Sequence, residues 1–210
     1  MSWISRLLLL LSSATVCLAA SSPDSLYLSD YCGKSLTVKR SVILKSTIFQ
    51  DNNCRVTLEP STGNNLVAHF NTYRQTSGVA ALANIFSGEC SSEYIQLYNS
   101  FGEKLMGIHG YCKSERPTEH YELGQSGRFE YHSASLTYLS FELLVTETYK
   151  KSTSDEECPA GQFDCEWLRN CVDDALKCNG YNNCGSNDDE TVGCGPPSSL
   201  LLSTLLPLIP

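Results

Sequence analysis

The stretch that decides the fold is residues 158–194, CPAGQFDCEWLRNCVDDALKCNGYNNCGSNDDETVGC. It places six cysteines within 37 residues and contains few large apolar side chains. A unit of this size is not held by a hydrophobic core alone and needs cross-links or a metal. Three disulfides are therefore the predicted framework of this segment. The acidic run Asp188, Asp189 and Glu190 near its end is a candidate cation site.

Four further cysteines are widely spaced over the preceding part of the chain: Cys32, Cys54, Cys90 and Cys112. Between the two sets lies the polar run 150–157 (KKSTSDEE), which contains no apolar residue. That composition is typical of a linker. We therefore divide the chain into a first domain at 32–148, a linker at 149–157 and a second domain at 158–194.

The N-terminus indicates the compartment. Arg6 is the one charge in the first 23 residues, and an unbroken leucine run at 7–11 is followed by small residues up to Ala19 and Ala20. This pattern predicts a secretory signal peptide at 1–19, whereas a membrane anchor would need a longer apolar stretch. Cleavage would remove Cys17 and leave ten cysteines. In an oxidising compartment these form five disulfides with no free thiol.

Charge and composition exclude two classes of protein. A hydrophobic fraction of 41% excludes wholesale disorder, and a formal net charge of −8 argues against nucleic-acid binding, which requires a basic face. Residues 155–190 hold ten Asp+Glu and two Lys+Arg, so the acidity belongs to the linker and the second domain.

The first domain has the alternating pattern of β-strands. Apolar residues at every second position predict strands at Val56 and Leu58; Leu66, Ala68 and Phe70; Ile95 and Leu97; Leu105 and Ile108; and Thr137, Leu139, Phe141, Leu143 and Val145. Many short strands separated by turn residues predict a mainly β fold, an antiparallel β-sandwich. The apolar stretch 78–86 (GVAALANIF) does not alternate and is interpreted as a long loop between strands.

Several motifs of the first domain resemble those of the CUB domain family. They are Cys32-Gly33, Cys54 before an alternating strand, Cys90-Ser-Ser-Glu-Tyr-Ile-Gln-Leu97, Gly110-Tyr-Cys112 and Ser140-Phe-Glu-Leu-Leu-Val145. The resemblance covers about residues 32–148. It implies a CUB-like, jelly-roll type β-sandwich with disulfides Cys32–Cys54 and Cys90–Cys112.

The second domain resembles a low-density lipoprotein receptor class A module in the order and spacing of its cysteines, Phe163 and acidic residues. The resemblance implies a small disulfide-rich, calcium-binding module with little regular secondary structure, and disulfides Cys158–Cys171, Cys165–Cys184 and Cys178–Cys194. A CUB-like domain followed by one such module resembles the low-density lipoprotein receptor class A domain-containing protein 2 group.

The class A resemblance also implies a calcium site. Its side-chain ligands would be Asn179, Asn183, Asp189 and Glu190, and its carbonyl ligands would come from Leu176 and Tyr181. Two carboxylates of the family are asparagines here. Both still offer an oxygen, but the lost charge predicts weak Ca²⁺ binding, on the order of 10⁻⁴–10⁻³ M as in extracellular modules.

Ligand capture in the class A family uses an acidic cage and an aromatic residue that receive a partner's lysine. The cage positions correspond to Asn179, Tyr181 and Asn183, and the aromatic position corresponds to Leu176. None of these residues is acidic or tryptophan. The resemblance therefore predicts calcium binding without lysine docking of the usual kind.

The CUB family has a calcium site of its own, built from one Glu and two Asp. The corresponding positions lie near Thr76, at Glu93 and near His132. One carboxylate remains, so no calcium is predicted there.

We expect no enzymatic activity. The four histidines are His69, His109, His120 and His132, and no Gly-x-Ser-x-Gly, His-Glu-x-x-His or phosphate-loop motif is present. The ten mature cysteines are all assigned to disulfides, which leaves no catalytic thiol and no catalytic residue to nominate.

The C-terminal tail, 195–210, carries no charge and ends in LLLSTLLPLIP at 200–210. Eleven apolar residues are too few to span a bilayer. A lipid-anchor signal, a truncated membrane span and a plain secreted tail are the three interpretations. The sequence thus predicts an extracellular protein, secreted or attached to the cell surface, that recognises an unidentified protein ligand. The alternative is a structural or adhesive matrix component.

Overall fold

The computed structural model describes residues 20–46, 53–76, 90, 93–133, 138–166 and 168–194. The predicted signal peptide, the stretch 78–86 and the tail 195–210 lie outside these residues. In chain order the elements are β1 (Asp24–Tyr27), η1 (Leu28–Tyr31), β2 (Ser35–Val38), β3 (Ser41–Lys45), β4 (Asn53–Pro60), β5 (Asn65–Thr76), β6 (Glu93–Tyr98), β7 (Tyr121–Gly124), β8 (Gly127–Ser133), β9 (Tyr138–Lys150), β10 (Gln162–Cys165), β11 (Asn170–Asp173), η2 (Asp174–Leu176) and α3 (Asp188–Thr191).

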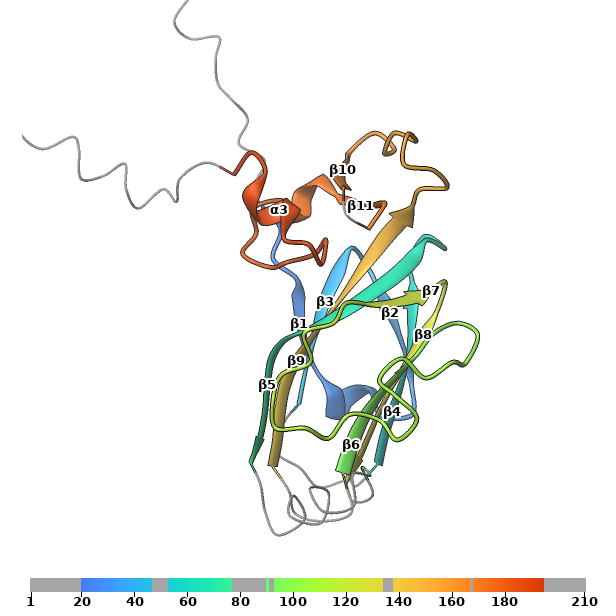
Figure 1. Ribbon diagram of the computed structural model, residues 1–210, viewed down its shortest axis with the longest axis vertical. Coiled ribbons are helices and arrows are strands. Elements are labelled where there is room, and N and C mark those ends of the chain that lie inside the picture. Colours follow the sequence, from blue (N-terminus) through green and yellow to red (C-terminus); the bar gives the residue numbers. More distant parts are fainter. Residues whose placement is uncertain are drawn as a thin grey trace, which may run out of the picture.

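Two sheets face each other and form the predicted sandwich (Figure 1). One contains β1, β3, β9, β5 and β7, and the other has the order β2-β4-β8-β6. The pairs β1–β3 and β2–β4 are parallel, which differs from a wholly antiparallel sandwich. The reason is that the chain crosses to the opposite sheet after each of β1, β2 and β3, so every second strand runs in the same direction.

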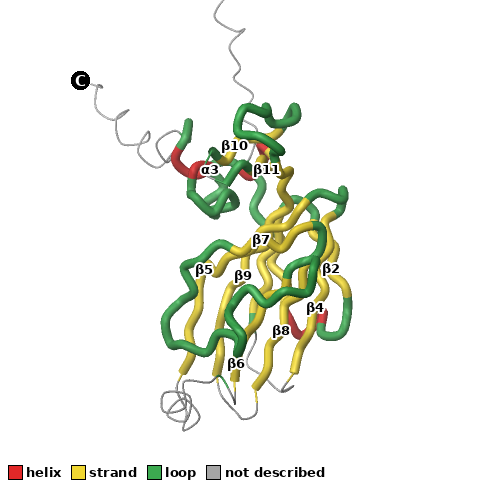
Figure 2. Tube along the Cα trace, turned by 45° about the vertical axis from the view of Figure 1, so that its right-hand side comes forward, coloured by secondary structure: helices red, strands yellow, loops and turns green. Residues whose placement is uncertain are grey.

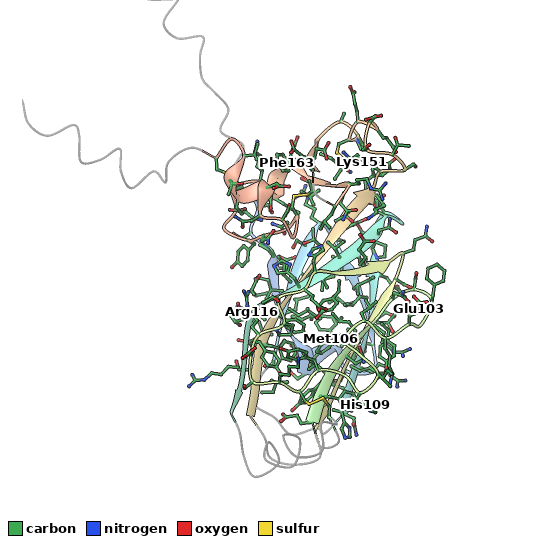
Figure 3. The ribbon with its side chains drawn as sticks, in the orientation of Figure 1. Glu103, Met106, His109, Arg116, Lys151 and Phe163 are labelled. Carbon is green, nitrogen blue, oxygen red and sulfur yellow. A yellow bond between two sulfur atoms is a disulfide. The ribbon has the colours of Figure 1, made fainter. Side chains whose placement is uncertain are left out.

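Alternating apolar side chains fill the space between the sheets. Phe70, Leu97, Phe129 and Phe141 are each at most 1% exposed, and burial of a side chain of this size contributes about 1.5–3 kcal/mol. Met106, from the loop after β6, lies in the same interior (Figure 3). The mainly β fold class predicted from the alternation is confirmed.

The second domain, hereafter the small module, extends one sheet of the sandwich and is not joined to it by a flexible linker alone. The end of β9 pairs with β11, with Lys150 opposite Asn170 and Tyr149 opposite Cys171. β10 then pairs with β11. Figure 2 shows that the small module is otherwise mostly loop. The sequence segment 149–157, predicted as a linker, therefore begins inside a strand.

The remainder of that segment is also held in place. Lys151 is 5% exposed, and its Nζ donates to both carboxylate oxygens of Asp164 at 2.6 and 2.7 Å. Its backbone N–H donates to the carbonyl of Arg169. Glu156 accepts from the Tyr149 hydroxyl at 2.6 Å. A polar composition predicts a linker, but here Lys151 bonds to the small module and Glu156 bonds to the end of β9.

Two disulfides lie within the sandwich and three within the small module. They are the pairings implied by the two resemblances: Cys32–Cys54, Cys90–Cys112, Cys158–Cys171, Cys165–Cys184 and Cys178–Cys194. The apolar core of the small module consists of Val172, Leu176 and two of its disulfide sulfurs, with Phe163 packed against them (Figure 3). So small a core explains why this segment needs three cross-links.

Candidate functional site

Five of the six predicted calcium-ligand residues lie together: Asn179, Tyr181 and Asn183 in the loop between η2 and α3, and Asp189 and Glu190 in α3. Asn183 is fully buried, and its backbone N–H and side chain contact Asp189, Tyr181 and Asn179. Glu190 reaches back to the turn at Asn179. The Cys178–Cys194 and Cys165–Cys184 bridges close this loop. Leu176, predicted to offer its carbonyl, has its side chain in the module core.

Both carboxylates of the cluster are satisfied by backbone amides. Asp189 accepts from the N–H of Asn183 at 2.8 Å and from that of Cys184 at 3.3 Å. Glu190 accepts from the N–H of Asn179 at 2.9 Å and from that of Gly180 at 2.8 Å. Burial raises the pKa of Asp189 above its ordinary value, and the two N–H donors oppose that shift. The acidic residues therefore shape the loop.

The amide of Asn183 decides whether a cation fits. Its Nδ2 donates to Asn179 Oδ1 at 3.1 Å and to the carbonyl of Tyr181 at 2.8 Å. These two oxygens are ligands in the predicted calcium site, so Asn183 turns its amide nitrogen, and not its amide oxygen, toward the other ligands. A Ca²⁺ ion would require oxygens facing this point. The residues present, arranged in this way, do not fit calcium.

The surfaces implied for lysine capture are largely unavailable. Leu176 is 1% exposed and Asn183 is fully buried. Asn179 uses its Nδ2 to bond the carbonyl of Ser21 at 3.0 Å. Tyr181 is partly exposed, although its carbonyl is engaged by Asn183. That the module does not dock lysine in the usual way stays a prediction.

Contacts between the small module and the sandwich were not predicted from the sequence. Arg40, between β2 and β3, forms a 3.0 Å ion pair with Asp173. Thr146, buried in β9, donates to Asn183 Oδ1 at 3.2 Å. No local motif points to these pairs, because the partners are separated by 37 residues or more in the chain.

Two histidines, His69 and His120, meet beside the small module with ring centroids 5.8 Å apart. Burial lowers the pKa of each to about 4, and for His69 the neighbouring His120 lowers it further. They line a hollow of about 470 Å³ together with Arg116, Glu119, Tyr181 and Asn182. The alternation of Leu66, Ala68 and Phe70 predicted a strand that includes His69, but no local pattern indicated that His120 would lie next to it.

The positions of the CUB-family calcium site lie at one end of the sandwich. Glu93 is 2% exposed and accepts from the Tyr131 hydroxyl at 3.5 Å. His132 stacks on Tyr94 with centroids 5.1 Å apart. The Thr76 side chain lies outside the described part of the structure. Within the described residues, no group of three or more His, Cys, Asp or Glu side chains is placed to hold a metal ion.

The loop 99–110 is a surface feature that the sequence analysis missed. Leu105 and Ile108 were predicted to lie in a strand, but this prediction is wrong because Gly107 and Gly110 have positive φ angles and turn the chain into a loop. The loop exposes Ile108 by 78% and Phe101 by 87%. The turn residues Asn99 and Gly102 were the available signal.

No protein-family model and no curated protein matches the chain. Among the solved structures that match are chains that contain CUB domains. The CUB1-EGF-CUB2 domain of human MASP-1/3 is 18% identical, with a TM-score of 0.42, over 55% of this chain and 42% of that chain. The CUB1-EGF-CUB2 domains of rat MASP-1 are 15% identical, with a TM-score of 0.42, over 55% and 40%. The MASP-1 CUB2 domain bound to Ca²⁺ is 16% identical, with a TM-score of 0.43, over 55% and 98%. This chain thus spans about two fifths of the first two.

Proposed function

We propose that the protein recognises a protein ligand in the extracellular space, as a receptor, co-receptor or auxiliary subunit. The observation that carries the proposal is the loop 99–110, which presents Phe101 and Ile108 to solvent. Large exposed apolar side chains have apolar area available for burial against a partner. Aromatic residues also dominate the energetics of protein interfaces.

The loop is preorganised by its own hydrogen bonds. Asn99 Oδ1 accepts from the N–H groups of Phe101 and Glu103 at 3.0 and 2.9 Å. The buried Gln96 side chain donates to the carbonyl of Gly107 at 2.7 Å and accepts from the N–H of Met106 at 2.9 Å. Ordering a loop before binding reduces the entropy lost in the complex. These bonds support a binding role for the exposed Phe101 and Ile108 side chains.

The test measures whether the fluorescently labelled protein binds saturably to the outer surface of intact cells. Replacement of Phe101 and Ile108 by Ser should weaken binding by about tenfold or more, the size of a hot-spot loss. The matched control is Thr72→Ser and Ser35→Ala, two exposed strand positions away from the loop. Equal binding of the wild type and the Phe101/Ile108 variant would contradict the proposal.

The second candidate is the structural or adhesive component. The same exposed Phe101 and Ile108 would then serve self-association. Sedimentation of the purified protein separates the two: concentration-dependent oligomers that the Ser variant abolishes support adhesion, and a monomer that still binds cells supports recognition.

Several parts of the proposal go beyond the fold. Five disulfides are typical of an extracellular protein, and we propose secretion or attachment to the cell surface through the tail 195–210. Nucleic acid is not a proposed partner and catalysis is not a proposed activity. We also propose that the small module belongs to the class A family and the chain to the group with that order of modules. The sequence predicts that weakly bound calcium stabilises the small module for this function. The contacts of Asn183 favour a different stabiliser, argued below.

A further inference from the structure

We propose that the amide of Asn183 takes the place of a calcium ion, so that the small module folds and docks on the sandwich without calcium. Five of the six predicted ligand residues lie together in the structure, but the Asn183 side chain turns an N–H donor toward two of the others. Asn179 Oδ1 and the Tyr181 carbonyl, at 3.1 and 2.8 Å from Nδ2, are the oxygens that this donor joins.

The orientation of that amide follows from its neighbours. The Tyr181 carbonyl can only accept, and Asn179 Oδ1 already accepts from the Tyr181 N–H at 2.8 Å, so the group that faces both must donate. On its other side, Oδ1 of Asn183 accepts from the Thr146 hydroxyl at 3.2 Å. Calcium would need the opposite orientation, with oxygen toward the centre. The hydrogen-bonded amide and the bound ion therefore exclude each other.

The second replaced position is used in the same way. Asn179 Nδ2 donates to the carbonyl of Ser21 at 3.0 Å, and the N–H of Ser21 donates to the carbonyl of Ala175 at 2.6 Å. A carboxylate at position 179 would have no proton to donate to this carbonyl. Both asparagines thus use an N–H donor that an aspartate lacks, one toward the N-terminal segment and one inside the loop.

The two carboxylates of the cluster also have hydrogen-bond donors without a cation. The four carboxylate oxygens of Asp189 and Glu190 each accept one backbone N–H. A third carboxylate at position 183 would face acceptor oxygens in a fully buried place. It would require a positive ion for compensation. Asn183→Asp should therefore recreate the dependence on calcium that the wild type lacks.

The experiment is thermal unfolding of the full secreted chain in EDTA and in about 10 mM CaCl₂, an excess over the 10⁻³ M affinities of weak extracellular sites. The wild-type Tm should agree within about 1 °C between the two conditions. A bound ion of that affinity would raise Tm by about 3 °C, and such a rise in the wild type would overturn the inference.

The Asn183→Asp variant supplies the second arm. Its Tm in EDTA should fall by about 5 °C or more, because the buried carboxylate is unpaired, and calcium should restore most of the loss. Asn182→Asp, which adds the same charge one residue away, is the matched control and should not respond to calcium. A variant Asn183→Asp that unfolds in EDTA as the wild type does would also overturn the inference, whatever the cell-binding result.

Discussion

At the scale of single residues, Gly185 shows how closely the small module approaches the sandwich. Its φ is +86°, and a Cβ built on it would lie 2.7 Å from Cγ of His120. Gly161 has a similar φ of +82° with nothing within 4 Å of the added atom. The two glycines therefore separate the cost of a left-handed backbone from the cost of displacing the neighbouring domain.

We predict that Gly185→Ala destabilises the protein more than Gly161→Ala. Both lose about 1–2 kcal/mol from the left-handed conformation, and Gly185→Ala loses about 1–3 kcal/mol more by overpacking against His120. Chemical denaturation measures both. Adding His120→Ala to Gly185→Ala should recover part of the extra loss. Equal destabilisation by the two alanines would show that the module does not press on His120.

The buried pair His69 and His120 predicts a loss of stability in acid. Because burial lowers the folded-state pKa of both to about 4 while the unfolded value is 6.5, the unfolded chain takes up protons first as the pH falls below 6.5. The contribution of the two neutral histidines to the free energy of unfolding is fully present above pH 6.5 and declines down to about pH 4. At pH 5 the loss is about 2 kcal/mol per histidine. The charged groups that contribute to these shifts are Arg116, Glu122 and Lys150.

Urea unfolding at pH 7.5 and at pH 5 tests this prediction. The double variant His69→Gln and His120→Gln should lose less stability between the two pH values than the wild type. His109→Gln, at an exposed position in the loop after β6, is the control and should behave as the wild type. If the double variant keeps the full acid sensitivity, other groups cause it.

At the scale of elements, β9 carries both parts of the chain. Its apolar alternation from Leu139 to Val145 was predicted from the sequence and is buried in the sandwich. The continuation at Thr146, Glu147 and Thr148 is also buried, although it is polar. Glu147, for example, accepts from the Ser61 hydroxyl at 2.8 Å. Alternation reveals an apolar face, but it does not reveal a polar strand end that other loops cover.

The connection after β9 should resist proteolysis, unlike a linker. Lys151 is buried and paired with Asp164, so trypsin should cut the native protein after the exposed Lys113 before it cuts after Lys151. Asp164→Asn removes the partner of a buried ammonium group and should accelerate cleavage there, whereas Asp174→Asn, at an exposed site, should not. Cleavage after Lys151 as fast as after Lys113 would contradict the structured connection.

The candidate site shows the limit of local sequence patterns in another way. The cysteine framework was enough to bring Asn179, Asn183 and Glu190 into one loop, because disulfides fix the loop regardless of what fills it. The direction in which Asn183 donates depends on Thr146, a residue of the other domain. The chemistry of the cluster is therefore decided by docking, which spacing within 158–194 does not encode.

At the scale of the whole molecule, the acidic module and the electrically balanced sandwich form one body. The small module shares a sheet with the sandwich through β9 and β11. Away from that sheet, Arg40 pairs with Asp173, and the N–H of Ser21 bonds the carbonyl of Ala175. Contacts on several sides of the module restrict rotation about the connection, which a single shared strand pair would permit.

Rigid docking predicts a single tumbling time. Backbone ¹⁵N relaxation of the secreted protein should give the same rotational correlation time for the amides of β4–β8 and for those of β10, β11 and α3. Thr146→Val removes the hydroxyl that joins Ser41 and Asn183. It should increase the amplitude of the module's motion relative to the sandwich without unfolding the sandwich.

A shorter correlation time for residues 158–194 in the wild type would mean that the domains move independently. In that case the loop 99–110 and the acidic module would meet partners separately. A common correlation time would mean that a partner meets the exposed Phe101 and the acidic surface at a fixed separation, so that substitutions in both domains should affect the same binding event.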